Sequence, residues 1–214
     1  MRKSYYCNVT LKMGIPPHLY IIMNNLSHNE AVPPARIKIQ DMIINEHQII
    51  RHHTWGLCVP KYQNLVLDWD YTTIAIHHSG DRGRKDPVAI EKLHLQKHHW
   101  DDVGYHYLIH PDGTIYEGRE IVYKGCHIKQ QNTGKIGILM LGDYDKQIWD
   151  FDDELTTEHL AKLKGLITTL TTVFPIKILG GHREFISQDK GCPGNLLINV
   201  MANLRKEFQC DINC

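Results

Sequence analysis

The sequence predicts an α/β domain in which a central mixed β-sheet is flanked by helices. Short apolar or β-branched runs alternate along the chain with helix-like segments, which is typical of this fold class. Turn residues separate these runs, and one Asp-Gly pair lies between two strand-like runs, as in a hairpin. The chain has 214 residues, which is enough for one such domain with an appendage.

The N-terminal part carries no assigned element, because "IPP" and "AVPPAR" interrupt any long periodic pattern. We therefore expect two parts: an N-terminal extension of unknown role over 1–47, and the folded domain over 48–210. The extension begins with basic residues, but its longest apolar run, "LYIIM", is shorter than the core of a secretory signal peptide. No run approaches the roughly 20 apolar residues of a membrane span, so we expect none.

The first half of the domain should contain a strand, a helix and a hairpin, at 71–79, 86–100 and 103–119. The first run, "YTTIAIHHS", is β-branched and apolar, which indicates a buried strand. Asp86 is a candidate N-cap and Pro87 fits the first helical position of the next segment. The third segment is typical of a hairpin, with its turn at Asp112-Gly113.

The second half should contain a central strand, a long helix, a short strand and a last helix, at 135–142, 155–174, 176–181 and 194–208. "KIGILMLG" is continuously apolar, as expected of a central strand. The long helix has Thr156 as a candidate N-cap. Its apolar residues step by 3 and 4: Leu160, Leu163, Ile167, Leu170 and Phe174. The last helix places on one face Leu197, Val200 or Met201, Leu204 and Phe208.

Composition excludes some classes of partner. The 24 Lys and Arg residues balance 24 Asp and Glu residues, so the formal net charge is zero. No overall field attracts the chain to nucleic acid or to an anionic membrane, and we expect no nucleic-acid partner. The six cysteines include no C-x-x-C pair and are too irregularly spaced for a disulfide framework.

Candidate metal ligands lie at the ends of two predicted strands. His77 and His78 end the first strand, where successive side chains point to opposite faces, so only one of them faces a cleft. His182 follows the strand at 176–181, and Cys192 lies ten residues further along. Cys192 could be a zinc ligand, a disulfide partner, a nucleophile or a buried apolar residue. Spacing alone favours a site without metal, because no H-E-x-x-H or C-x-x-C pair fixes an ion.

Four motifs occur in order along the domain: "IAIHHS", "WDDVGYHYLIHPDGTIYEGR", "GCHIKQQNTGKIGILMLGDY" and "GHREFISQDKGCPG". Together they resemble the zinc-dependent type 2 N-acetylmuramoyl-L-alanine amidases, a family that includes phage lysozyme amidases and peptidoglycan recognition proteins. "IIRHHTWG" at 49–56 is similar to the Arg-x-x-Trp-Gly opening of peptidoglycan recognition domains. The resemblance extends to about residue 208 and covers roughly three quarters of the chain.

The resemblance implies an enzyme with one zinc ion (Zn2+) as its cofactor. The ligands it implies are His77, His182 and Cys192, with His78 outside the ligand set. The implied reaction is hydrolysis of the amide bond between the lactyl group of N-acetylmuramic acid and the L-alanine of peptidoglycan. In such a site zinc lowers the pKa of water towards about 7 and so supplies hydroxide at neutral pH.

The resemblance also implies roles for residues around the metal. Tyr105 matches a catalytic tyrosine that orients water or transfers its proton, and Lys190 matches a lysine that stabilises the oxyanion. His127 matches a histidine of the substrate groove. A related branch, the cytoplasmic recycling amidases, has a catalytic glutamate where this chain has Leu139. The chain therefore fits the tyrosine-type site of phage amidases and recognition proteins better.

These motifs lead to one expected function and two alternatives. We expect a wall-lytic endolysin or a secreted antibacterial effector that acts on peptidoglycan. The alternatives are a non-catalytic module that binds peptidoglycan or muropeptide, and a cytoplasmic amidase that recycles muropeptides. Without a signal peptide, the protein would be synthesised in the cytoplasm and would reach the cell wall or periplasm through phage lysis or a secretion system. A secreted toxin would require an immunity protein as a partner.

Other polar and aromatic residues are expected to lie outside the site. The histidine pairs expected to be solvent-exposed and without function are His52-His53 and His98-His99. Asp101 and Asp102 are adjacent, so they are not expected to converge as a pair of catalytic carboxylates. Trp100 and Tyr107 are interpreted as core residues rather than sugar platforms, with a stacking role for one of them left open. Cys126 is interpreted as a core residue rather than a further thiol ligand.

Overall fold

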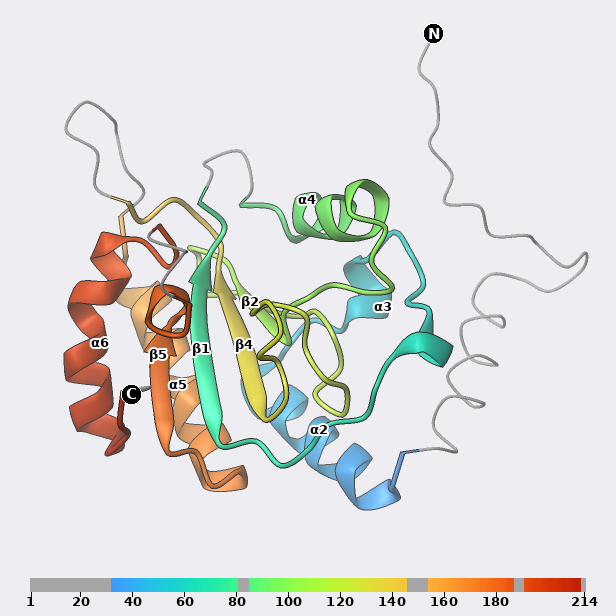
Figure 1. Ribbon diagram of the computed structural model, residues 1–214, viewed down its shortest axis with the longest axis horizontal. Helices are drawn as coiled ribbons and strands as arrows, with labels where there is room; N and C mark the ends of the chain where they lie inside the picture. The colour runs from blue at the N-terminus through green and yellow to red at the C-terminus, as the bar shows by residue number, and fades with distance from the viewer. Residues whose placement is uncertain (1–31, 81–84, 146–153, 187–190, 213–214) are drawn as a thin grey trace, which may run out of the picture.

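The computed structural model describes residues 32–80, 85–145, 154–186 and 191–212. Its sheet has five strands: β1 (Thr73–His78), β2 (Tyr107–Ile109), β3 (Ile115–Glu117), β4 (Lys135–Met140) and β5 (Ile178–Gly181). The strand order is β3-β2-β4-β1-β5, and only the β2–β3 pair is antiparallel. The sheet is therefore mixed, with β4 at its centre, which confirms the predicted fold class (Figure 1).

Helices cover the sheet: α2 (Pro34–His47), α3 (His52–Trp55), α4 (Pro87–Glu91), α5 (Thr157–Val173) and α6 (Asn195–Phe208). Shorter turns lie at η1 (Tyr62–Asn64), η3 (Lys92–Lys97) and η4 (His182–Glu184). Both predicted N-caps are confirmed. The side chain of Asp86 accepts a hydrogen bond from Val88 N, and the side chain of Thr156 accepts one from His159 N. The helix expected over 86–100 is shorter and changes to π-helical geometry in η3.

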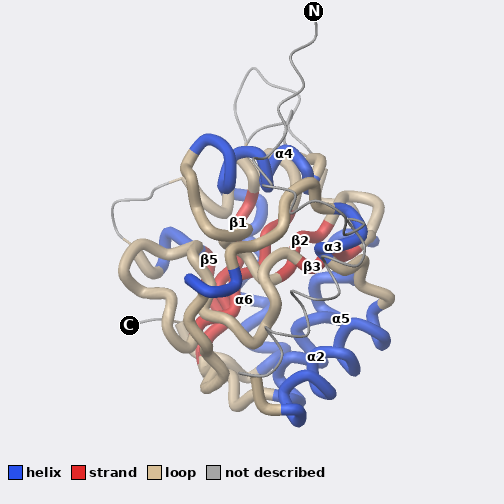
Figure 2. Tube along the Cα trace, turned by 90° about the vertical axis from the view of Figure 1, so that its right-hand side faces the viewer, coloured by secondary structure: helices blue, strands red, loops and turns tan. Residues whose placement is uncertain are grey.

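The N-terminal part differs from the expectation that prolines prevent a long element. Residues 34–47 form the 14-residue helix α2, because Pro34 stands at its first position, where proline is favoured. Ile43 and Ile44 are buried in the main core. Figure 2 shows α2 beside α5, against which it packs. The boundary between 47 and 48 stays a prediction, but α2 belongs to the same packed unit as the sheet.

The two faces of the sheet are packed differently, and this difference determines which face can carry the site. Ile74 and Ile76 of β1 point into the main core together with the buried residues of α5 and α6. His77 alternates with them and therefore points to the opposite face. His78 lies on the same side as Ile76, and its Nδ1 accepts a hydrogen bond from Tyr144 N at 3.2 Å. Of the two histidines, His77 is the one free to face a cleft.

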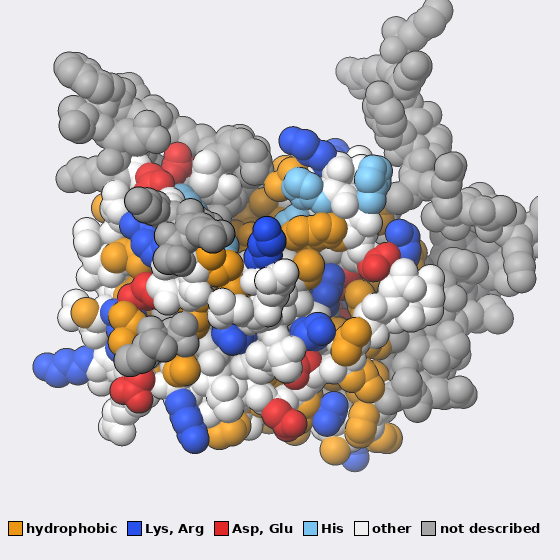
Figure 3. Space-filling view, in the orientation of Figure 1, with side chains coloured by type: hydrophobic (Ala, Val, Ile, Leu, Met, Phe, Trp, Pro, Cys, Tyr) orange, Lys and Arg blue, Asp and Glu red, His pale blue; other side chains and the backbone are white. Residues whose placement is uncertain are grey.

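Charged side chains of both signs are interspersed with apolar ones on the face shown in Figure 3, in keeping with the zero formal net charge. Within the described ranges, none of the helices combines the length and the apolar character needed to cross a bilayer.

Candidate metal centre

Three predicted ligands converge at one edge of the sheet. His77 lies near the end of β1, and His182 directly follows β5. Because β1 and β5 are parallel neighbours, their carboxyl ends meet at the same edge. Cys192 approaches from the segment that precedes α6, and the ligand atoms of the three side chains all lie within 4.8 Å of one another. We call His77, His182 and Cys192 the metal centre.

The donor atoms of the metal centre fit zinc. His77 Nδ1 lies 3.6 Å from Cys192 Sγ. Tetrahedral zinc, with Zn–N of about 2.0–2.1 Å and Zn–S of about 2.3 Å, separates a nitrogen and a sulfur ligand by about 3.6 Å. The His77 and His182 rings lie side by side, with centroids 4.5 Å apart. Two imidazoles and one thiolate also match the donor types that zinc takes from proteins.

The Gly-His-Arg-Glu sequence fixes His182 and Cys192 relative to each other. Arg183 N donates to Cys192 O at 2.9 Å, and the Arg183 guanidinium bonds Asn195 Oδ1 at 2.9 Å. The backbone also approaches closely here, because a Cβ added to Gly181 would lie 2.6 Å from Pro193 Cδ. Glycine at this position therefore allows the Cys192 segment to pack against the end of β5.

Electrostatics keep the buried rings of the site neutral. Burial lowers the pKa of His77 well below its ordinary value, and the nearby His127, His182 and His78 lower it further. Burial, followed by the charge of His106, likewise lowers the pKa of His127. A metal-ligating histidine must be neutral, so the surroundings favour the form that binds a metal.

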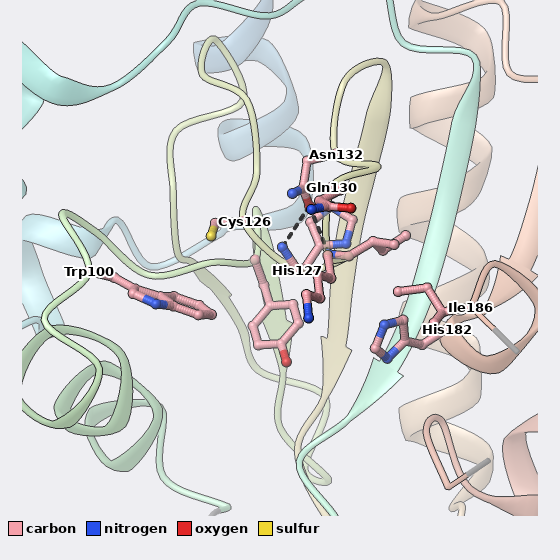
Figure 4. A pocket seen from close by; sticks show the side chains of 10 residues that line it. Trp100, Cys126, His127, Gln130, Asn132, His182 and Ile186 are labelled. Atoms are coloured by element: carbon pink, nitrogen blue, oxygen red, sulfur yellow. Dashed lines mark hydrogen bonds between the residues drawn. The ribbon is translucent and has the colours of Figure 1, made fainter. Parts of the chain in front are cut away.

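A cavity of about 730 Å³ opens beside the metal centre. It is lined by Trp100, Tyr105, Cys126, His127, Ile128, Lys129, Gln130, Asn132, His182 and Ile186 (Figure 4). The predicted catalytic Tyr105 lies next to the first ligand, since the ring centroids of Tyr105 and His77 are 5.0 Å apart. His127 contacts the same ligand, with its Nδ1 3.0 Å from His77 Nε2. The predicted catalytic Lys190 lies outside the described residues.

A second cavity of about 320 Å³ adjoins the first, and the two share Trp100, Cys126 and Asn132 in their linings. Trp100 is more than a packing residue: its ring stacks on His94, with centroids 4.5 Å apart, and Trp100 itself lines both cavities. Tyr107 is buried, as predicted. Cys126 is half-buried and lies in the cavity wall, and burial raises the pKa of its thiol.

The expectation for His52 is wrong, because this residue is 5% exposed. Its Nε2 lies 3.1 Å from Glu91 Oε1, and its Nδ1 lies 3.6 Å from Asp102 Oδ1. Arg119 completes this group, with its Nε 3.5 Å from Asp102 Oδ2. We call His52, Glu91, Asp102 and Arg119 the ionic cluster. The remaining members of the two histidine pairs are exposed, as predicted: His53, His98 and His99.

Asp101 and Asp102 do not converge, in agreement with the sequence expectation. The Asp101 carboxylate pairs with Lys61 at 3.2 Å, whereas Asp102 is buried in the ionic cluster. Burial raises the pKa of Asp102 to about 6, against the opposing effect of His52 and Arg119. His52 and Asp102 lie in two of the quoted motifs, but nothing in those motifs indicated that the two residues meet, since they are 50 residues apart in the chain.

The chain matches the family model described as N-acetylmuramoyl-L-alanine amidase over residues 68–195. It is 34% identical over 160 residues to peptidoglycan-recognition protein SC2 of Drosophila melanogaster, a match that covers 71% of this chain and 83% of that protein. It is 35% identical over 94 residues to the endolysin of Escherichia phage T7, covering 44% of this chain and 60% of the endolysin. A match to the N-acetylmuramoyl-L-alanine amidase of Sus scrofa reaches 31% identity over 119 residues. That match covers 53% of this chain but only 18% of the pig protein.

Solved structures share the fold. Drosophila PGRP-LB superimposes with a TM-score of 0.63 at 24% identity, covering 78% of this chain and 97% of that one. The N-acetylmuramoyl-L-alanine amidase LysC from Clostridium intestinale superimposes with a TM-score of 0.62 at 24% identity, covering 76% of this chain and 98% of LysC. The family model spans more than half of this chain, and the ordered motifs fall on the metal centre and its cavity. The chain therefore belongs to the Amidase_2 family of N-acetylmuramoyl-L-alanine amidases.

Proposed function

We propose that the chain is a zinc-dependent amidase that hydrolyses the bond between the lactyl group of N-acetylmuramic acid and L-alanine in peptidoglycan. The observation that carries this proposal is the convergence of His77, His182 and Cys192 within 4.8 Å beside a cavity of about 730 Å³. Family membership supplies the substrate class, and the complete set of donor atoms favours an enzyme over a module that only binds.

The chain's own residues would divide the chemistry as follows. Zinc, when bound, supplies a Lewis acid that polarises the amide carbonyl and makes water a better nucleophile. Tyr105 lines the cavity beside His77, so its hydroxyl is suited to orient the attacking water and to pass on a proton. Lys190 would donate a hydrogen bond to the carbonyl oxygen as negative charge develops there. The leaving amine of L-alanine must receive a proton, and Tyr105 is our candidate donor.

The two adjoining cavities provide room for substrate on both sides of the scissile bond. The first cavity is lined by apolar Ile128 and Ile186, the second by polar Asn64 and Lys124, and Trp100 lines both. We propose that the muramoyl group and the stem peptide extend along this pair of cavities. The mixture of apolar walls and a few polar groups is typical of small-molecule sites.

We further propose that the substrate is met in the cell wall, as for a lytic endolysin or a secreted antibacterial effector. Leu139 supports this reading, because it is the β4 partner of His77 and is fully buried among apolar residues. A carboxylate of the kind that recycling amidases carry is thus replaced by an apolar side chain next to the metal centre. Delivery would require phage lysis or a secretion system, and an effector would require an immunity protein.

The test is product analysis on purified sacculi incubated with the zinc-loaded chain. We expect free stem peptides with an L-alanine N-terminus, together with glycan that retains intact lactyl groups. Cys192→Ser should abolish this release and weaken zinc retention. Cys58→Ser is the matched control, because Cys58 lies outside both cavities, and it should remain active. A chain that binds stoichiometric zinc and sacculi but releases no peptide would instead be a recognition module, and the proposal would be wrong.

A further inference from the structure

We infer that His127 is a positioning residue, which accepts a hydrogen bond from His77 and so fixes the ring nitrogen that His77 offers to a metal. The inference rests on the proposed zinc site and concerns how that site is held. Sequence resemblance instead placed His127 in the substrate groove. The contacts of its two ring nitrogens, both of which are used within the protein, favour the positioning role.

The hydrogen-bond partners fix the tautomers of both rings. His127 Nε2 lies 3.3 Å from the carbonyl oxygen of Lys135, which only accepts, so this nitrogen carries the proton. The Nδ1 of a neutral His127 is then an acceptor, and it lies 3.0 Å from His77 Nε2. His77 Nε2 must therefore carry a proton and donate it. The bare nitrogen of His77 is Nδ1, which is the one that faces Cys192 Sγ at 3.6 Å.

The His127 ring is held tightly enough to act as a fixed acceptor. Cβ atoms added to Gly125 or Gly137 would each lie 2.6 Å from its Cδ2, so the ring packs between two glycines. Asn132 Oδ1 accepts from the backbone N–H of His127 at 2.8 Å and from that of Ile128 at 2.7 Å, and Figure 4 shows Asn132 beside His127. The glycines of "GCHIK" and "KIGILM" thus leave the space that the ring requires.

Histidine ligands commonly donate their second N–H to an acceptor of this kind, which orients the ring and strengthens it as a ligand. The acceptor is usually a carboxylate, a carbonyl or water, whereas here it is a neutral imidazole. Because an imidazole adds no negative charge, His127 would set the orientation of His77 without adding to the charge of the zinc site.

The test compares zinc affinity in two variants of similar shape, measured by competition with a chromophoric chelator. His127→Asn can place Oδ1 near the site of Nδ1 and so keep an acceptor, whereas His127→Leu removes it. We expect His127→Leu to weaken zinc binding about 10–100-fold and His127→Asn to stay within a few-fold of the parent chain. Equal affinities in both variants, whether strong or weak, would overturn the positioning role. Thermal unfolding of the metal-free variants controls for a general loss of fold.

A second measurement needs no substitution. Nitrogen-15 NMR of the histidine rings should show His127 with its proton on Nε2 and a bare Nδ1, in the metal-free and the zinc-loaded chain alike. A proton on Nδ1 of His127 would overturn the inference. A parent chain with this tautomer that nevertheless fails to bind zinc would contradict the proposed function and leave the hydrogen bond established, so the two failures are distinguishable.

Discussion

The metal centre and the ionic cluster both bury histidine, yet they shift its pKa in opposite directions. Around His77, burial and other imidazoles lower the pKa, and among the residues that the structure describes no carboxylate contributes to the shift. Around His52, burial also acts to lower the pKa, but the hydrogen bond to Glu91 and the charges of Asp102, Glu91 and Glu117 outweigh it and raise the pKa. Burial alone therefore does not decide whether a histidine is charged.

The difference separates function from stability. The lowered pKa of His77 favours the neutral form that accepts a metal, whereas the carboxylates around His52 raise its pKa and favour the protonated form, which cannot. The ionic cluster instead ties α3 to α4, because Glu91 Oε2 also accepts from Leu57 N at 2.8 Å and Glu91 Oε1 from Cys58 N at 3.0 Å. We expect changes in the first region to affect zinc binding and catalysis, and changes in the second to affect the free energy of unfolding.

The largest expected effect comes from removing a ligand. His182→Ala should reduce amidase activity at least about 1,000-fold, because the site loses one of three protein ligands and the zinc chemistry with it. The free energy of unfolding of the metal-free chain should change little, since His182 is only partly buried. Activity assays and zinc titration test the loss of zinc chemistry, and urea unfolding tests the unchanged free energy of unfolding. His53→Ala, an exposed histidine, should match the parent chain in all of them.

Disrupting the ionic cluster should instead lower the free energy of unfolding and leave zinc binding intact. Glu91→Ala should lower the free energy of unfolding by about 3–5 kcal/mol, because it leaves buried His52 without its main partner and two backbone N–H groups without an acceptor. Zinc affinity of the folded fraction should stay within a few-fold of the parent. Urea unfolding with zinc titration measures both, and a large loss of zinc affinity in a fully folded variant would break the separation between the two regions.

The smallest expected effect is on how the free energy of unfolding depends on pH. The pKa of His52 is raised above 6.5 in the folded chain, so the folded state binds more protons than the unfolded state above that pH. Its stabilising contribution is complete below about pH 6.5 and is lost as the pH rises through the folded pKa. The pKa of Asp102 is also raised, to about 6, so its contribution to stability likewise falls as the pH rises, between roughly pH 4 and 6.

Urea unfolding of the metal-free chain between pH 6 and 9 would reveal this contribution. The parent should lose more stability over this range than His52→Gln, which cannot titrate but can still donate to Glu91. Parallel curves for the two proteins would contradict a charged His52.

The family resemblance implied the residues of the metal centre, whereas nothing in the sequence indicated the ionic cluster. The predicted strand ends made His77 and His182 candidates, but spacing alone favoured a site without metal, and the ordered motifs implied all three ligands. The structure brings them together because β1 and β5 are parallel neighbours whose carboxyl ends meet at one edge. His52 lies in the motif "IIRHHTWG", but its partners lie on α4 and just before the hairpin segment and are brought together only by tertiary packing. That motif supported the family resemblance but did not indicate that His52 is buried.

The same limit explains the errors in local structure. Prolines at the start of α2 resembled interruptions, since sequence alone does not tell whether a proline begins or breaks a helix. Trp100 has an ordinary core pattern, and only the positions of His94 and of the two cavities reveal that it borders the site. By contrast, the strands with continuous apolar runs are correctly placed, and the two helices with clear caps begin where predicted, although α4 ends earlier than expected.

The central claim is that His77, His182 and Cys192 together hold one zinc ion, and X-ray absorption at the zinc edge tests it most directly. We predict stoichiometric zinc with two nitrogen ligands at about 2.0–2.1 Å and one sulfur ligand at about 2.3 Å, the remaining position being filled by a light atom. Cys192→Ser should remove the sulfur signal, whereas Cys126→Ser should keep it. A zinc-loaded parent chain without a sulfur ligand, or one whose sulfur signal survives in Cys192→Ser, would contradict the account.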